Sequence, residues 1–159
     1  MIKTAVAGLA LLALIPSVSF AGGGHDHSHG GMATVPEGEA APTLALDASP
    51  DTMSGYNLHL MVENFTFSPE RTGVESDAVE GHAHLYVNGD KVGRVYGTWV
   101  YLSGEMLPEA ENTVRVTLND NMHRDWAADG AIVEAEVVLP GGTMSAGHDH
   151  GAHQGHKSN

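Results

Sequence analysis

The middle of the chain consists of short runs in which apolar and polar residues alternate. The clearest run is HAHLYV at residues 82–87, where three apolar residues alternate with two histidines and a tyrosine. Successive side chains of a β-strand point to opposite faces, so His82 and His84 share a face that is not apolar. Asn88-Gly89 follows at once and is a strong signal for a hairpin turn. A two-residue loop would place Gly93 opposite His84 and leave open space beside that imidazole, whereas a bulged three-residue loop would shift the register by one.

Similar alternation recurs along the chain. It predicts further strands at residues 43–47, 56–67, 91–97, 98–103, 112–118 and 132–139. Phe65 and Phe67 break the alternation of the long second segment, so we expect a bend near Asn64. No segment shows a sustained helical period. Short strands at this spacing predict an all-β fold, an antiparallel β-sandwich of about seven strands of the immunoglobulin or cupredoxin type.

The two ends of the chain differ from this alternating middle. Residues 1–21 combine a basic start, an apolar run too short to span a bilayer and a small-residue cleavage site, which predicts a cleaved secretory signal peptide. Residues 22–41 and 141–159 are rich in glycine and histidine and have no apolar periodicity. We therefore expect disordered tails on both sides of one domain at residues 42–140.

Charge and the absence of cysteine narrow the function. Twenty Asp and Glu residues oppose seven Lys and Arg residues, for a net charge of −13 at neutral pH. Nucleic acids and anionic lipid surfaces are therefore not expected partners, whereas cations would be attracted. The lack of cysteine excludes disulfides, a cysteine-linked membrane anchor and a blue-copper site. With the signal peptide, this composition is typical of a soluble periplasmic protein.

Histidines and methionines supply the candidate metal ligands of the domain. The candidates are His59, Met61, His82, His84, Met122 and His123. The first two share the non-core face of segment 56–67, and the last two lie in the polar segment NDNMHRDW after a strand. If the strands belong to one sheet, these side chains can converge on one patch. Imidazole and thioether groups without a thiolate suit copper, and three histidines with a carboxylate would suit zinc.

Most histidines lie outside the predicted domain. Seven of the eleven are in the two tails: His25, His27, His29, His148, His150, His153 and His156. Such segments do not contribute to a packed core, so we expect them to bind metal weakly and to raise its concentration near the folded site. Metal should be released below about pH 6, because imidazole must be neutral to bind and its reference pKa is about 6.5.

One stretch also carries a resemblance. At GHAHLYVNGDKVGRVYGTW, with NLHL upstream and NDNMH downstream, the chain resembles a group of small exported bacterial proteins with a GHAHLYVNG-type core, over roughly residues 50–138. This resemblance implies a compact β-domain and a polar cluster of His59, His82, His84 and His123. The group often has a histidine where this chain has Tyr101, so the likeness does not extend to a ligand from that strand. A looser likeness is to periplasmic copper-resistance and copper-chaperone β-sandwich proteins, which also use histidine and methionine without cysteine. This likeness is an analogy of fold and composition, and a fold does not fix a function.

These observations favour a periplasmic protein that binds copper for sequestration, delivery or resistance, with another periplasmic metalloprotein or an exporter as its partner. The alternative is a zinc, nickel or cobalt buffer that binds metal only through its tails, with the core as a protein-interaction module. An enzyme is not expected, because the chain has no nucleophile motif and no phosphate-binding glycine loop. The enzymatic alternative, a copper redox enzyme with a histidine brace, would need a histidine in place of Gly22 at the mature amino terminus.

Overall fold

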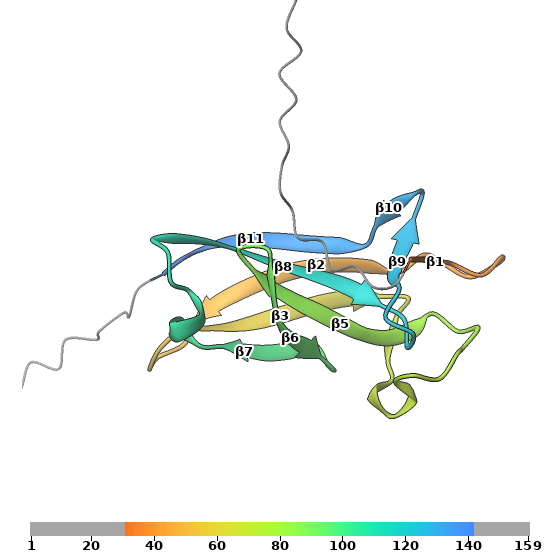
Figure 1. Ribbon diagram of the computed structural model, residues 1–159, viewed down its shortest axis with the longest axis horizontal. Coiled ribbons are helices and arrows are strands. Elements are labelled where there is room, and N and C mark those ends of the chain that lie inside the picture. Colours follow the sequence, from red (N-terminus) through yellow and green to blue (C-terminus); the bar gives the residue numbers. More distant parts are fainter. Residues whose placement is uncertain (1–30, 142–159) are drawn as a thin grey trace, which may run out of the picture.

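A computed structural model describes residues 31–141, whose regular secondary structure is mostly β-strand (Figure 1). The strands are β1 (Met32–Thr34), β2 (Thr43–Pro50), β3 (Tyr56–Glu63), β4 (Thr66–Phe67), β5 (Glu80–Val87), β6 (Asp90–Val95), β7 (Trp99–Leu102), β8 (Glu111–Asn119), β9 (Asp125–Ala128), β10 (Ala131–Ile132) and β11 (Glu134–Pro140). Single 3-10 turns lie at Pro69–Arg71 and Gly104–Met106. Within this range, no helix has the length and apolar character needed to cross a membrane. The predicted all-β fold is confirmed.

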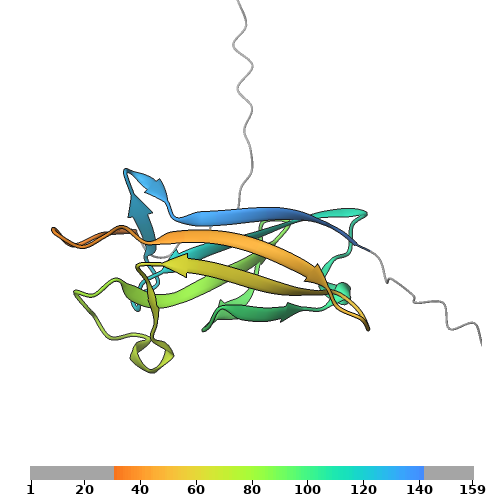
Figure 2. The same cartoon turned by 180° about the vertical axis from the view of Figure 1, so that it is seen from behind.

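The strands form two sheets. The larger has the order β1-β9-β8-β5-β4, with β6 paired to β5, β10 to β9 and β11 to β8. The smaller has the order β2-β3-β7, and β2 and β3 lie in front of β5 and β8 in Figure 2. All pairings are antiparallel except β1 with β9 and β4 with β5. The central strands β5 and β8 therefore have hydrogen-bonded neighbours on both edges.

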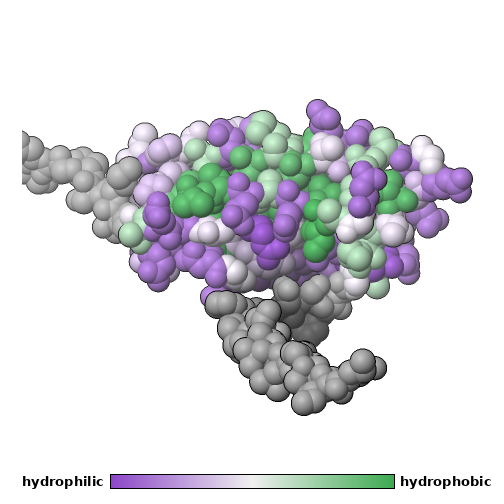
Figure 3. All heavy atoms as spheres, turned by 90° about the horizontal axis from the view of Figure 1, so that it is seen from above, coloured by the Kyte–Doolittle hydropathy of each residue, from purple (hydrophilic) through white to green (hydrophobic). Residues whose placement is uncertain are grey.

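One hydrophobic core lies between the sheets. It combines residues of the smaller sheet, Leu58, Leu60 and Leu102, with residues of the larger sheet, Ala83, Leu85, Val87, Val114, Val116 and Leu118. On the face shown in Figure 3, hydrophobic residues form separate small patches between hydrophilic ones. Strand β5 turns its apolar face to the core, so its two histidines lie on the outer face of the larger sheet.

Two short strands differ from the sequence prediction, and one predicted irregularity is found. β1 lies within the predicted disordered tail, where it pairs with β9 and buries Ala33 to 6% exposure. The folded part therefore begins before residue 42. β9 was not predicted, because a strand of this length carries too little alternation to be recognised. The expected bend in segment 56–67 is confirmed: Asn64 has a φ of 54° and separates β3 from β4.

The hairpin of β5 and β6 has the predicted turn but a different register. Asn88 and Gly89 have φ values of 52° and 90°, as a type I′ turn requires. A register shift further along the hairpin places Arg94, rather than Gly93, opposite His84. The open space expected beside this imidazole from a regular two-residue hairpin is therefore not found, and the register is shifted by one residue. A guanidinium-bearing residue occupies that position instead.

Candidate metal centre

Two histidines of the site come from β5. His82 and His84 pair with Asn119 and Thr117 of β8, and cross-strand partners in an antiparallel pair lie on the same face. Although this face is turned away from the core, His82 is 0% exposed and His84 is 5% exposed. Another part of the chain must therefore cover the two rings.

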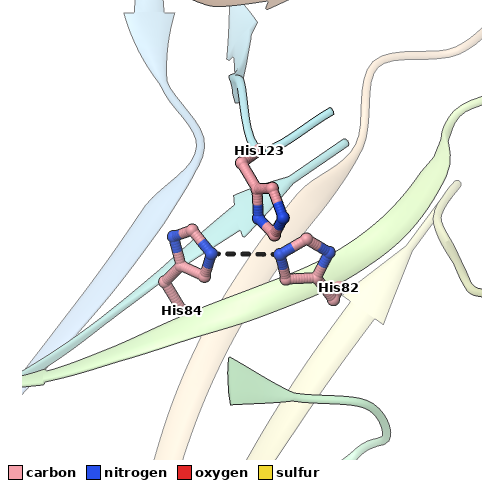
Figure 4. Close-up of side chains that lie close together, drawn as sticks. All are labelled: His82, His84 and His123. Carbon is pink, nitrogen blue, oxygen red and sulfur yellow. Dashed lines mark hydrogen bonds between the residues drawn. The ribbon is translucent and has the colours of Figure 1, made fainter. Parts of the chain in front are cut away.

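The cover includes the loop at residues 120–124 between β8 and β9. The Asp120 carboxylate accepts hydrogen bonds from the backbone amides of Met122 at 2.9 Å and Arg124 at 2.8 Å. It also accepts one from Arg124 Nε at 2.6 Å. His123 has a φ of 66°, a left-handed conformation that is uncommon outside glycine but enriched for histidine. This turn directs the His123 ring toward the two rings of β5 (Figure 4).

Asn121 anchors the loop from the opposite side. Its side chain is buried and donates hydrogen bonds to Ser68 Oγ at 3.1 Å and to Glu80 Oε1 at 3.4 Å. Its backbone carbonyl accepts from the Gly73 amide at 2.7 Å. Glu80 is further held by Arg71 at 3.0 Å. The position of His123 is therefore set by contacts with a second loop as well as by its own turn.

Gly81 lets β5 approach β8 closely just before His82. Its φ is 149°, and a Cβ at this position would lie 2.0 Å from the Asn119 carbonyl oxygen and 2.9 Å from backbone atoms of Asp120. Real Cβ atoms do not reach such distances, so only glycine fits. Because Gly81 has no side chain, the strand that carries His82 can lie directly against the start of the loop that carries His123.

The three imidazoles have the spacing of ligands to one ion. One nitrogen from each of His82, His84 and His123 lies within 4.8 Å of the other two. The Nε2 atoms of His82 and His84 are 3.0 Å apart (Figure 4). Two nitrogens bound at about 2.0–2.1 Å, at an angle of about 90–110°, would lie roughly 2.9–3.4 Å apart. The pair on β5 already has this separation.

Burial keeps these rings neutral. Desolvation is the largest cause that lowers the pKa of His82 to about 4 and that of His84 to about 3, and nearby positive groups add to it. The pKa of His123 is also lowered, by burial and then by Arg94. Because metals bind the neutral ring, all three are in the binding form at neutral pH. The ordinary histidine pKa led us to expect metal release below about pH 6. Because the pKa values are lowered here, this centre should release its metal only at a lower pH.

One buried nitrogen has no explanation within the packing. His82 Nδ1 has no hydrogen-bond partner among the described residues, although its ring is fully buried. Buried polar atoms are almost always paired, so an unpaired one often marks a functional position. The donor set is consistent with that interpretation, since three neutral imidazoles converge from two separate segments.

His59 and Met61 do not join this cluster. Both lie on β3 of the smaller sheet, so the condition under which they would converge with His82, that their strands belong to one sheet, is not met. The ring of His59 instead stacks on Trp99, with centroids 4.1 Å apart and planes 3° apart. Strand alternation assigns a side chain to a face but does not specify which strands pair, and the pairing separated these residues.

The remaining candidates have different outcomes. Met122 is 43% exposed, and its backbone amide helps to fix the loop that carries His123. The seven tail histidines and the predicted signal peptide lie outside residues 31–141, which are the residues that the structure describes. Sequence reasoning missed Asp120 and Asn121, although the run Asn119-Asp120-Asn121 contains side chains that often bond to nearby backbone in turns.

No family model, curated protein or solved structure matches the chain. The assignment of the site therefore rests on its own geometry. That geometry defines a candidate metal centre with three histidine ligands.

Proposed function

We propose that this protein binds a transition-metal ion through His82, His84 and His123. The observation that carries the proposal is the convergence of three neutral imidazoles, two of them buried and one partly exposed, with their ligand nitrogens within 4.8 Å of one another. No carboxylate belongs to this group among residues 31–141. Three protein ligands would leave a coordination position open, as in metal sites that bind a further ligand.

Copper is the metal that we assign to the centre. Nitrogen ligands bind Cu(II) more tightly than the other divalent ions of the first transition row, and imidazole also binds Cu(I). A thioether preference no longer contributes, because Met61 lies on the other sheet. Zinc is the second candidate, since three histidines with an open fourth position form an established zinc ligand set.

We propose further that the protein acts after export to the periplasm, where it sequesters copper or delivers it to another metalloprotein or an exporter. The pattern of residues 1–21 supports export, and the seven tail histidines would collect ions weakly near the centre. The rings of β5 are nearly inaccessible, whereas His123 is partly exposed. An ion would therefore enter and leave past His123. We assign a binding role to the centre and no reaction.

The two sheets that share one core favour a β-sandwich of the immunoglobulin or cupredoxin type. A blue-copper centre is excluded because the chain has no cysteine. The proposed site also lies on the outer face of the larger sheet, under a loop. Its location therefore comes from this chain's own packing rather than from the fold type.

Metal retention tests the proposal on the full chain. The protein would be loaded separately with copper, zinc, nickel and cobalt, then dialysed against a chelator strong enough to strip the tails. We expect the wild type to retain one copper ion per chain and the double variant His82→Ala/His84→Ala to retain none. Loss of all copper from the wild type as well as from the variant would support the alternative in which only the tails bind metal. Competition between equimolar copper and zinc for the wild type would then decide which metal the centre prefers.

A further inference from the structure

Two cationic side chains border the three-histidine centre and have no ion-pair partner among the residues that the structure describes. Arg94 on β6 lies opposite His84, and Lys91 lies opposite Tyr86, the next residue on the same face of β5. The other three basic residues of the described range, Arg71, Arg115 and Arg124, each form an ion pair with a carboxylate. Within residues 31–141, Lys91 and Arg94 form no such pair.

The side chain of Arg94 is connected to the centre through Tyr96. Its Nη1 atom donates to the Tyr96 hydroxyl at 3.4 Å, and the Tyr96 ring is 5.8 Å from the ring of His82. Both Arg94 and Tyr96 are exposed, the tyrosine at 43%. A solute can therefore reach the guanidinium from solvent on the side where the imidazoles lie.

The positive charges of Lys91 and Arg94 are unexpected beside a cation site, because they repel the ion. Acidic residues outnumber basic ones by 20 to 7, so carboxylates were available to complete the centre. Of the nearby acids, Asp120 is held by Arg124, and Asp125 accepts a hydrogen bond from Asn119 at 2.6 Å. A divalent ion bound by neutral rings would add its charge to those of Lys91 and Arg94, and such an excess is costly unless an anion compensates it.

We propose that the metal at this centre takes a small carboxylate from solution as its fourth ligand, with one oxygen on the ion and the other held by Arg94. This inference rests on the metal-binding function proposed above. A guanidinium presents two parallel N–H donors, which match the paired oxygens of a carboxylate. Lys91 contributes charge from the next cross-strand position. The centre thus recognises an ion together with its counter-anion, rather than a bare ion.

Anion titration of the metal-loaded full chain tests this inference. The protein would be loaded with Cu(II), stripped of tail-bound metal with the chelator and titrated with acetate, and separately with azide, in a non-coordinating buffer. We expect a saturable change in the visible absorption of the copper. Arg94→Gln should weaken acetate binding by about tenfold, because a charge-assisted hydrogen bond is lost. Lys91→Gln should weaken it by roughly two- to fivefold through charge alone.

A matched control separates this role from general electrostatics. Arg115→Gln removes the same charge from the same face of the larger sheet, but from a residue already paired with Glu134 at 2.9 Å. It should leave acetate binding unchanged. Arg94→Gln should also bind the bare ion as tightly as the wild type or more tightly, because a repelling charge is gone. A variant that failed to fold would bind both the copper ion and acetate more weakly. Circular dichroism would detect such a loss of folding.

The outcomes are distinguishable from those for the proposed function. If the wild type retains copper but acetate and azide leave its spectrum unchanged, the anion site is overturned and the metal centre stands. Equal acetate affinity in Arg94→Gln and Arg115→Gln would overturn the role of Arg94. If the wild type retains no metal after chelation, both proposals fall together. A signal that depends on protein concentration would assign the carboxylate to a second chain and would overturn a free ligand.

Discussion

Two strand faces of this molecule carry histidines in the same alternating sequence pattern, but their surroundings in the structure differ. His82 and His84 on β5 and His59 on β3 all occupy the polar face of an alternating strand. The β5 face is covered by the loop that carries His123, and its two rings are 0% and 5% exposed. The β3 face remains on the surface, where His59 stacks on Trp99, which is 59% exposed.

The difference shows what a histidine needs before it can become a metal ligand. Both faces present imidazoles, but only the β5 face receives a third one from a separate segment. Burial then lowers the pKa of those rings and keeps them neutral. On the β3 face, a ring stacked flat against an indole gains packing and acquires no further ligand from the described histidines and carboxylates.

The largest effect should come from removing one histidine from each face in turn. His84→Ala should lower the copper affinity of the centre by at least about 100-fold, because changes beyond the ligands themselves already cost 10- to 100-fold at metal sites. His59→Ala should leave it unchanged. Competition with a chromophoric chelator measures both affinities, and thermal unfolding shows whether each variant remains folded. Equal losses in the two variants would contradict the assignment of the site to β5.

The second largest effect should come from the loop anchor. Asn121→Ala removes the hydrogen bonds that fix the His123 loop and should lower copper affinity about tenfold, with a loss of about 1–3 kcal/mol in the free energy of unfolding. Asn112→Ala is the matched control, because Asn112 is equally buried and hydrogen-bonded but lies near the start of β8, whereas Asn121 lies in the loop after the end of that strand. It should lose similar stability and keep its copper affinity. Equal affinities in the two variants would refute a specific role for the loop.

A smaller effect is expected from pH in the metal-free protein. Folding lowers the pKa of His82 to about 4 and that of His84 to about 3, so the unfolded chain binds more protons below its ordinary histidine pKa. Stability should be complete above about pH 6.5 and fall as the pH drops, by at most about 1.4 kcal/mol per pH unit for each ring. Urea unfolding at several pH values in the presence of a chelator measures the slope. His84→Gln should reduce it, and an unchanged slope would refute the pKa assignment.

The smallest effect should come from a change on the exposed β3 face, where His59 stacks on Trp99. Trp99→Ala removes an exposed ring and its stacking on His59, so the free energy of unfolding should change by less than about 1 kcal/mol. Copper affinity should stay the same. Urea unfolding and chelator competition measure the two quantities. A clear loss of copper affinity in this variant would show that the two faces are coupled, and would remove the contrast between them.

Much of the fold could be read from alternation. Each of the seven predicted segments contains at least one strand, and the turn at Asn88-Gly89 forms as expected. The pattern failed where an element was too short to show a period, as at β1 and β9, or where a local irregularity changed the register, as between β5 and β6. Those failures matter for the site, because the register places Arg94 beside His84.

The sequence by itself determined which side chains are chemically able to bind a metal, and it placed His82 and His84 on one face of one strand. It also made His123 a candidate, through its position in a polar turn. Only the tertiary structure decided that His123 closes over β5 and that His59 lies on the other sheet. The physical reason is that alternation acts along a single strand, whereas strand pairing and loop closure depend on contacts between residues distant in the chain, such as Asn121 with Ser68.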